Sequence, residues 1–236
     1  MEKIKTILKN EISGWKTWEV VWLGVATAII IAIGMYCKDT AMGIISSTTG
    51  LAYSILSGKG KLSAYFFGLI NATLYAIIAY RAALYGETML NAIYYVPMMF
   101  VGFFTWLKNM DMQTKEVKKR RMSLCAIIIV CFGIAVGTVG YGFALKALGD
   151  AMPFIDSFTT VASVVALIVS VGMYVEQWWI WEAVNLVTVY MWVMAFLQGS
   201  ESVATLVMWS LYLINGVVML VKWEKEIRSN ERAKNN

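Results

Sequence analysis

Histidine is absent from this chain of 236 residues, proline occurs twice, cysteine three times, and charged residues make up only 15% of the sequence. Without histidine there is no imidazole for general-base catalysis, metal ligation or a proton relay. The cysteines, which lie in apolar stretches without a CxxC pair, are interpreted as small hydrophobic residues. The sequence also lacks a P-loop, a GxSxG elbow and a pair of catalytic aspartates. We therefore expect no catalytic residue, no metal and no cofactor.

Apolar and aromatic residues dominate, at 59% of the chain, and the mean hydropathy is +0.65. A bilayer core about 30 Å thick needs roughly 20 mostly apolar residues per helical crossing, so the chain has room for about eight crossings. The sequence predicts an all-α integral membrane protein with spans at 19–37, 41–57, 62–84, 88–108, 122–147, 154–175, 177–198 and 202–222. The first run begins late and no small-residue cleavage pattern follows it, so we expect a true span and not a signal peptide.

The basic residues give an independent test of this topology. With eight spans, only Lys38, Arg81 and Lys146 fall on one side, which leaves 17 of the 20 lysines and arginines on the side of both termini. Positive residues accumulate on the cytoplasmic side of membrane proteins, so both termini are predicted to be cytoplasmic. The net charge of +5 is then explained by orientation and contact with the lipid bilayer, and not by nucleic-acid binding.

An internal repeat appears when the chain is compared with itself at an offset of 114 residues. Asn71 then aligns with Asn185, and Gly102 with Gly216. The few identities are weak as a count, but they fall at equivalent positions of equivalent spans. The predicted organisation is a parallel 3+1+3 helix core with one accessory helix, an arrangement found in transporters. In order, the segments are a cytoplasmic tail (1–18), the accessory helix (19–37), a first three-helix bundle (41–108), a basic cytoplasmic loop (109–121), a linking helix (122–147), a second three-helix bundle (154–222) and a cytoplasmic tail (223–236).

Polar residues inside a span usually face a bundle interior or a wet cavity. In the seventh span, Trp178, Trp181, Asn185 and Thr188 follow one another at spacings of three and four and so share one helix face. We predict that this face binds substrate through indole stacking and amide hydrogen bonds. Alternatively, the tryptophans belong to the interfacial aromatic belt. Glu182 on this helix is either a ligand or an ion-pair partner in packing.

Further candidate substrate-binding residues are Asn71, Tyr75, Asn91 and Tyr95 in the first bundle, and Asp156 and Thr160 in the second. Alternatives remain open for two of them. Asn71 either contacts substrate or joins helices by a hydrogen bond. Asp156 either contacts substrate or is a carboxylate stabilised at a helix N-terminus.

At these residues the chain resembles the Pnu-type vitamin transporters, a family that includes nicotinamide riboside transporters. The resemblance rests on the WxxW motif (Trp178 to Trp181) followed by Asn185, on the segment LYGETMLNAIYYVPMMFVGFFTW (84–106), on Asp156 and on the helix plan. It covers roughly residues 41–223, and the helix at 19–37 lies outside the common core.

The resemblance implies a fold similar to full-length SWEET transporters, a homotrimer in the bacterial cytoplasmic (inner) membrane, and uptake by facilitated diffusion. A cytoplasmic kinase that phosphorylates the substrate would trap it in the cell. Within the family the substrate is nicotinamide riboside, thiamine, riboflavin or a deoxynucleoside. Nicotinamide riboside is the leading hypothesis, because its flat, cationic ring suits an aromatic cage. An ion channel and an intramembrane enzyme are the alternatives from other classes, and neither a charged ring nor a catalytic motif supports them.

Overall fold

The structure is a computed structural model that describes residue 11 and residues 13–81, 88–111, 116–149, 152–197 and 203–235. Every named element in these ranges is a helix, as predicted. The chain divides into two compact units. The first unit comprises Met1–Lys118 and Val203–Asn215, and the second comprises Lys119–Ser202 and Gly216–Asn236. Each unit is described by itself below.

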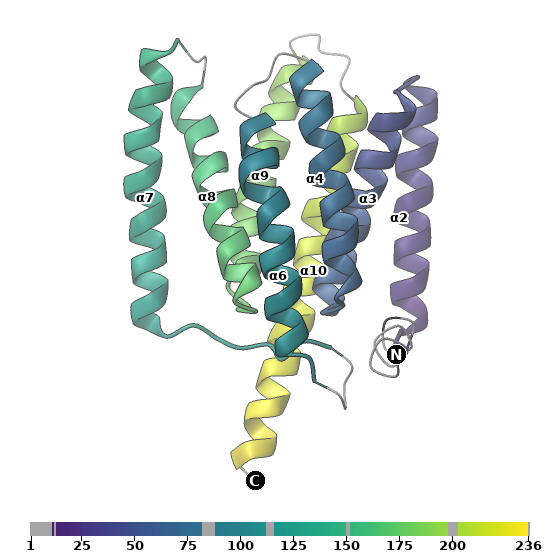
Figure 1. Cartoon of the computed structure of the whole chain (residues 1–236), viewed down its shortest axis with the longest axis vertical. Coiled ribbons are helices and arrows are strands. Elements are labelled where there is room, and N and C mark those ends of the chain that lie inside the picture. Colours follow the sequence, from purple (N-terminus) through teal and green to yellow (C-terminus); the bar gives the residue numbers. More distant parts are fainter. Residues whose placement is uncertain are drawn as a thin grey trace. The chain divides into compact units, whose positions relative to one another are not determined.

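The first unit is built around α3 and α4, which are antiparallel neighbours in sequence and in space (Figure 1). The accessory helix α2 packs on α3, and α4 packs on η1 and α6. The helices are α2 (Thr17–Tyr36), α3 (Ala41–Lys59), α4 (Ser63–Arg81), η1 (Leu90–Tyr95) and α6 (Val96–Lys108). Residues 82–87 lie outside the described part of the chain.

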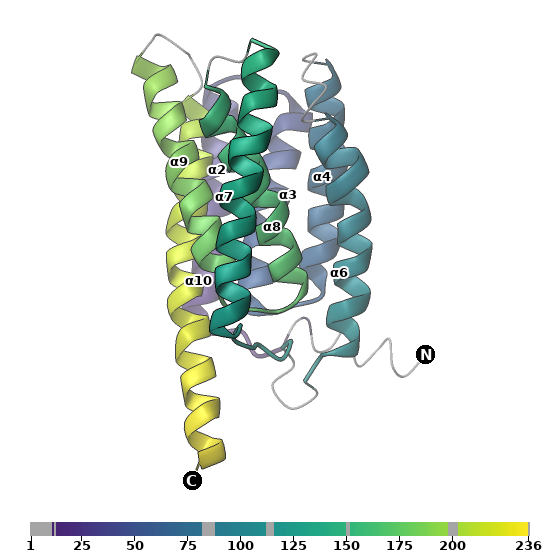
Figure 2. The same cartoon turned by 90° about the vertical axis from the view of Figure 1, so that its left-hand side faces the viewer.

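In the second unit, α7 packs on α8 and α8 packs on α9 (Figure 2). The helices are α7 (Leu124–Ala147), α8 (Pro153–Val171) and α9 (Gln177–Leu197). The long last helix α10 (Val203–Asn235) contributes its first part to the first unit and its remainder, from Gly216, to the second. Residues 198–202 are likewise outside the described part of the chain.

Local sequence signals explain where several helices begin and end. The hydroxyl of Thr40 accepts a hydrogen bond from the Gly43 amide at the start of α3, and Ser123 caps α7 in the same way. Gly60 ends α3 in the left-handed region, with φ of 76°, which a glycine adopts without strain. Pro153 occupies the first turn of α8, where its missing N–H costs no helical hydrogen bond.

Pro97 explains the irregular stretch in the fourth predicted span. A proline cannot donate to the carbonyl four residues earlier, which belongs here to Ile93. The residues before Pro97 form the π-helical segment η1, in which the Val96 amide donates to the Asn91 carbonyl five residues earlier. The span therefore consists of a π-helical turn followed by the regular helix α6.

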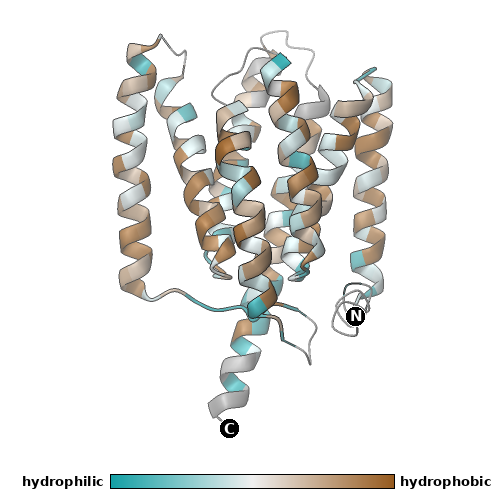
Figure 3. Ribbon diagram, viewed as in Figure 1, coloured by the Kyte–Doolittle hydropathy of each residue, from teal (hydrophilic) through white to brown (hydrophobic). Residues whose placement is uncertain are grey.

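Five helical segments are long and apolar enough to cross a membrane, judged by length and composition. They are Thr17–Tyr36, Leu90–Lys108, Leu124–Ala147, Pro153–Val171 and Leu206–Ser229. Figure 3 shows apolar residues along these helices. The most apolar stretch of α7 has no buried residue within the structure, as expected of a surface that faces lipid. The chain is thus a multi-pass membrane protein, and the eight-span topology stays a prediction.

The last helix continues to Asn235, whereas the sequence predicts an end at 222, because hydropathy marks where a span ends but not where a helix ends. Ion pairs at helical spacing, Lys222 with Glu226 and Arg228 with Glu224, favour the continued helix. Trp223 at this point is fully buried and receives the ammonium group of Lys119 over its ring. Part of the predicted C-terminal tail is therefore helical and packed.

Candidate functional site

The α9 residues predicted to bind substrate are all less exposed than Trp179, as expected if they share one face of the helix. Trp178, Asn185 and Thr188 are buried, Trp181 is half-buried, and Trp179 is 62% exposed. The helical spacing of three and four therefore identifies the packed face correctly, with Trp179 on the opposite side. Whether this face binds substrate stays a prediction.

Trp178 packs within the second unit. Its indole is 4% exposed and lies edge-on to the ring of Trp223 from α10, with 5.9 Å between ring centroids. Its Nε1 is buried, and no hydrogen-bond partner for it occurs among the described residues. An indole N–H in a buried place usually has an acceptor, so this donor is available to a ligand or to water.

Asn185 and Thr188 use their polar groups differently. The Thr188 hydroxyl donates to the carbonyl of Val184 one turn earlier, at 2.9 Å, and is thus satisfied within its own helix. The Asn185 amide lies 3.5 Å from Oε1 of Glu182, at the outer limit of a hydrogen bond. Asn185 is therefore held weakly and can form further hydrogen bonds with a substrate.

Asp156 and Thr160 lie one turn apart on α8, and both are half-buried. Asp156 is in the first turn, where the helix dipole stabilises a carboxylate. Its backbone carbonyl also accepts a hydrogen bond from the Thr159 hydroxyl at 3.0 Å. This position fits both alternatives, a helix N-terminal carboxylate and a substrate contact.

Asn71 in the first unit joins two helices. Its amide donates to the backbone carbonyl of Ser46 on α3 at 2.8 Å, and the Ser46 hydroxyl lies 3.3 Å away. The Tyr212 hydroxyl also reaches this place, because a Cβ at Gly50 would lie 2.4 Å from it and 2.8 Å from the Asn71 amide nitrogen. Asn71 therefore has the helix-joining role that the sequence left open, within a small polar cluster that includes Tyr212.

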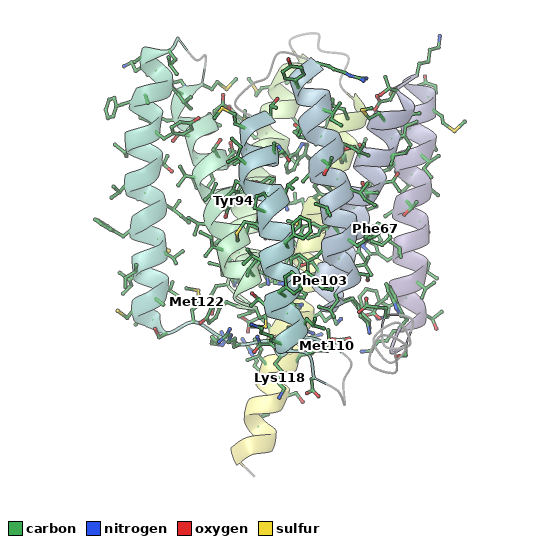
Figure 4. All side chains as sticks on the ribbon, viewed as in Figure 1. Phe67, Tyr94, Phe103, Met110, Lys118 and Met122 are labelled. Atoms are coloured by element: carbon green, nitrogen blue, oxygen red, sulfur yellow. The ribbon has the colours of Figure 1, made fainter. Side chains whose placement is uncertain are left out.

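The remaining candidates of the first unit lie along α4 and η1. Asn91 is buried inside η1, Tyr95 is half-buried, and Tyr75 on α4 is 38% exposed. The ring of Tyr95 lies 5.5 Å from the ring of Tyr94, which is labelled in Figure 4. Asn91 and Tyr95 thus belong to the same π-helical segment, as the sequence spacing indicates.

Asn215 is a polar residue that the sequence analysis did not select. It is fully buried on α10, its side-chain oxygen accepts a hydrogen bond from Trp22 of α2 at 3.1 Å, and its amide donates to Ser54 of α3 at 2.8 Å. Its position inside the apolar run LYLINGVVML was the available signal. Both of these partners are protein groups, which favours a structural role.

Two lysines near the α3–α4 turn are also buried, although the sequence indicates ordinary cytoplasmic lysines. Lys59 pairs with Glu19 at 2.5 Å and with Glu116 at 3.3 Å, and Lys61 donates to the carbonyl of Ser13 at 3.0 Å. The carboxylate of Glu11 accepts hydrogen bonds from the Leu62 and Ser63 amides at the start of α4. The segment before α2 thus covers this turn.

Within the described ranges, no three cysteine, aspartate or glutamate side chains come together as a metal-binding group. The candidate residues are aromatic rings, amides and hydroxyls, with the carboxylates of Asp156 and Glu182. Such a set suits a flat, polar organic ligand.

Comparison with known proteins agrees with this chemistry. Residues 40–225 match the family model described as nicotinamide mononucleotide transporter. A nicotinamide riboside transporter PnuC of Neisseria mucosa is 37% identical over 220 residues, which cover 91% of this chain and 84% of the relative. The corresponding protein of Haemophilus influenzae is 33% identical over 226 residues, which cover 94% of this chain and 96% of the relative. A crystal structure of the vitamin B3 transporter PnuC superposes with a TM-score of 0.81 at 36% identity, over 94% of this chain and 97% of that chain. The chain therefore belongs to the nicotinamide mononucleotide transporter family.

Proposed function

We propose that the protein takes up nicotinamide riboside across the membrane. The observation on which this depends is the similarity to two nicotinamide riboside transporters over more than nine-tenths of the chain. The residues of α9 are chemically suited to this substrate. The half-buried Trp181 offers a surface for stacking, and a cationic ring over an indole gains about 0.5 to 2 kcal/mol. The amide of Asn185 can pair with a ribose hydroxyl or the carboxamide.

Transport in this proposal is facilitated diffusion, followed by phosphorylation inside the cell. A phosphate adds a charge of about −1.5 to −2 at neutral pH, and none of the candidate binding residues is a lysine or arginine that could pair with it, so we expect the phosphorylated product to stay in the cell. The complete absence of histidine supports a mechanism that is independent of a proton relay. Loading of vesicles that lack kinase tests this step. The membrane potential must be held at zero in this test, because the substrate is a cation. Uptake should then stop when the two concentrations are equal, with or without a proton or sodium gradient, and accumulation beyond equality would contradict it.

The proposed assembly is a homotrimer with cytoplasmic termini in the cytoplasmic membrane and a SWEET-like 3+1+3 core. The positive charges on the side of the termini support the orientation. Two backbone positions support the repeat. Gly60, after α3, and Met173, after α8, both have positive φ, at 76° and 62°, and lie 113 residues apart, close to the offset of 114 found in the sequence. The trimer rests on the family resemblance.

The substrate can be identified by thermal unfolding of the purified protein with each candidate vitamin. A ligand that binds only the folded state stabilises it by about 2.7 kcal/mol at one hundred times its Kd. Nicotinamide riboside should raise the unfolding temperature more than thiamine, riboflavin or a deoxynucleoside at equal concentration. A larger effect of thiamine, whose ring is also flat and cationic, would assign the protein to another substrate of the family.

A further inference from the structure

Glu182 is a carboxylate inside the second unit that lacks a cationic partner in the described part of the chain. It is half-buried and lies six residues into α9, counting from Gln177. Four other glutamates of the described ranges, Glu19, Glu116, Glu224 and Glu226, each form an ion pair with a lysine or arginine. Glu182 has only the weak contact with the Asn185 amide at 3.5 Å. The described residues therefore offer no opposite charge to this carboxylate when it is ionised.

The position of this carboxylate depends on Gly216 of α10, in the same unit. A Cβ built on Gly216 would lie 1.7 Å from Oε1 of Glu182 and 2.8 Å from its carboxyl carbon. The carboxylate therefore occupies space that any other residue at 216 would fill. Gly216 is also the residue that the sequence offset pairs with Gly102, but Gly102 meets the ring of Tyr65 and not a charge. The space beside the glycine therefore holds a carboxylate in the second unit and an aromatic ring in the first.

Glu182 lies on the α9 face that carries the candidate binding residues. It follows Trp178 by four positions and precedes Asn185 by three, which places all three side chains on one side of the helix. The Trp178 Nε1, a donor without a partner among the described residues, lies one turn away. This face therefore combines a negative charge, an N–H donor and an amide beside the half-buried ring of Trp181.

A carboxylate in a membrane-spanning helix is costly when no opposite charge is present, and a cationic ligand offsets that cost where a neutral ligand cannot. We propose that Glu182 provides the counter-charge for the ligand's ring and so makes the site selective for cationic over neutral ring systems. This inference rests on the proposed function and specifies the substrate class of the same site. The ring of Trp181 stacks on neutral and cationic rings alike and adds a cation–π preference of its own, to which the charge of Glu182 contributes separately.

The test compares two ligands of nearly the same shape. Nicotinamide riboside has a cationic pyridinium ring, and its dihydro form has a neutral ring. The purified wild-type protein should bind the cationic form at least about tenfold more tightly, a difference of about 1.4 kcal/mol. In Glu182→Gln, which keeps the shape and removes the charge, this preference should fall at least about threefold below the wild-type value, through weaker binding of the cation and unchanged binding of the neutral form. The preference that remains is the cation–π contribution of Trp181.

Two further variants make the result decisive. Glu224→Gln removes a carboxylate that pairs with Arg121 and Arg228 in the C-terminal part of α10, and should leave the preference unchanged. Gly216→Ala keeps Glu182 but displaces its carboxylate, and should reduce the preference while the neutral form still binds.

Two results would overturn the inference while the proposed function stands. One is a wild-type protein that binds nicotinamide riboside without preference over the dihydro form. The other is a Glu182→Gln protein that loses both ligands equally, or neither. If the wild-type protein binds neither ligand, the proposed function itself fails.

Discussion

The ammonium group of Lys59 lies 2.5 Å from the carboxylate of Glu19, and the two side chains are only 3% and 1% exposed. The pair joins the end of α3 to the first turn of the accessory helix α2. Lys59 also donates to the carbonyl of Gly14 and lies over the ring of Trp15. The helix α2, which precedes the residues 40–225 matched by the family model, is thus joined to α3 by a buried ion pair.

Lys59→Met should lower the free energy of unfolding by about 3 to 5 kcal/mol, because it leaves the Glu19 charge buried without its partner. Thermal unfolding of the purified protein measures this loss. Arg228→Met is the matched control, since it removes a similar pair with Glu224 in which the arginine is 70% exposed. That change should cost no more than about 1 kcal/mol. If both variants lose the same free energy of unfolding, burial of the Lys59–Glu19 pair does not determine its contribution to stability.

Gly102→Ala should destabilise the first unit by about 1 to 3 kcal/mol, because the added methyl group overfills a packed site. A Cβ there would lie 2.1 Å from Cε1 of Tyr65, whose buried ring is itself held edge-on against Trp106. Gly133→Ala in α7 is the control, since its Cβ meets no atom within 4 Å. It should be neutral or stabilising by up to about 1 kcal/mol, as alanine favours the helix. If the thermal midpoint falls equally in both variants, the contact between residue 102 and Tyr65 is not what destabilises Gly102→Ala.

Trp181→Ala and Asn185→Ala should each weaken nicotinamide riboside binding by about 1 to 3 kcal/mol, since one removes a stacking surface and the other a hydrogen-bonding amide. Trp179→Ala, at the exposed position of the same helix turn, should leave the Kd nearly unchanged. Titration of the three purified variants decides the assignment. Loss of binding in Trp179→Ala alone would place the substrate on the other side of α9.

The orientation can be tested by labelling single cysteines in intact cells. In a background with Cys37, Cys125 and Cys131 replaced by serine, a membrane-impermeant maleimide should label Leu148→Cys, which follows α7 on the predicted outer side. Arg228→Cys, in the predicted cytoplasmic part of α10, should be labelled only after the cells are opened. Both residues are largely exposed in the structure, so the side of the membrane on which each cysteine lies decides whether the maleimide reaches it. The reverse pattern would invert the topology.

The sequence predicts the helices well, because hydropathy and capping act locally. Thr40, Ser123 and Pro153 each mark a helix start that a reader of the sequence can find. The face of α9 is also predictable, since the burial of Asn185 and the exposure of Trp179 follow from helical spacing alone.

Other features depend on partners far away in the sequence. Lys59 is buried because Glu19, 40 residues earlier, neutralises it, and nothing near Lys59 indicates that pairing. Asn215 meets Trp22 across 193 residues. The carboxylate of Glu182 has room only because residue 216, on another helix, is a glycine. Such contacts arise from tertiary packing, which neither periodicity nor composition encodes.

The π-helical turn before Pro97 has a consequence for how related sequences are aligned. A π-turn contains one residue more than the corresponding α-helical turn, and each residue of an α-helix advances the side-chain direction by about 100°. Relatives that lack one residue between Leu90 and Tyr95 would keep α6 in register and present a different side of the preceding segment. An alignment gap at this place would therefore mark a rotation of Asn91 relative to Gly102, and comparison of such relatives would be informative about substrate choice within the family.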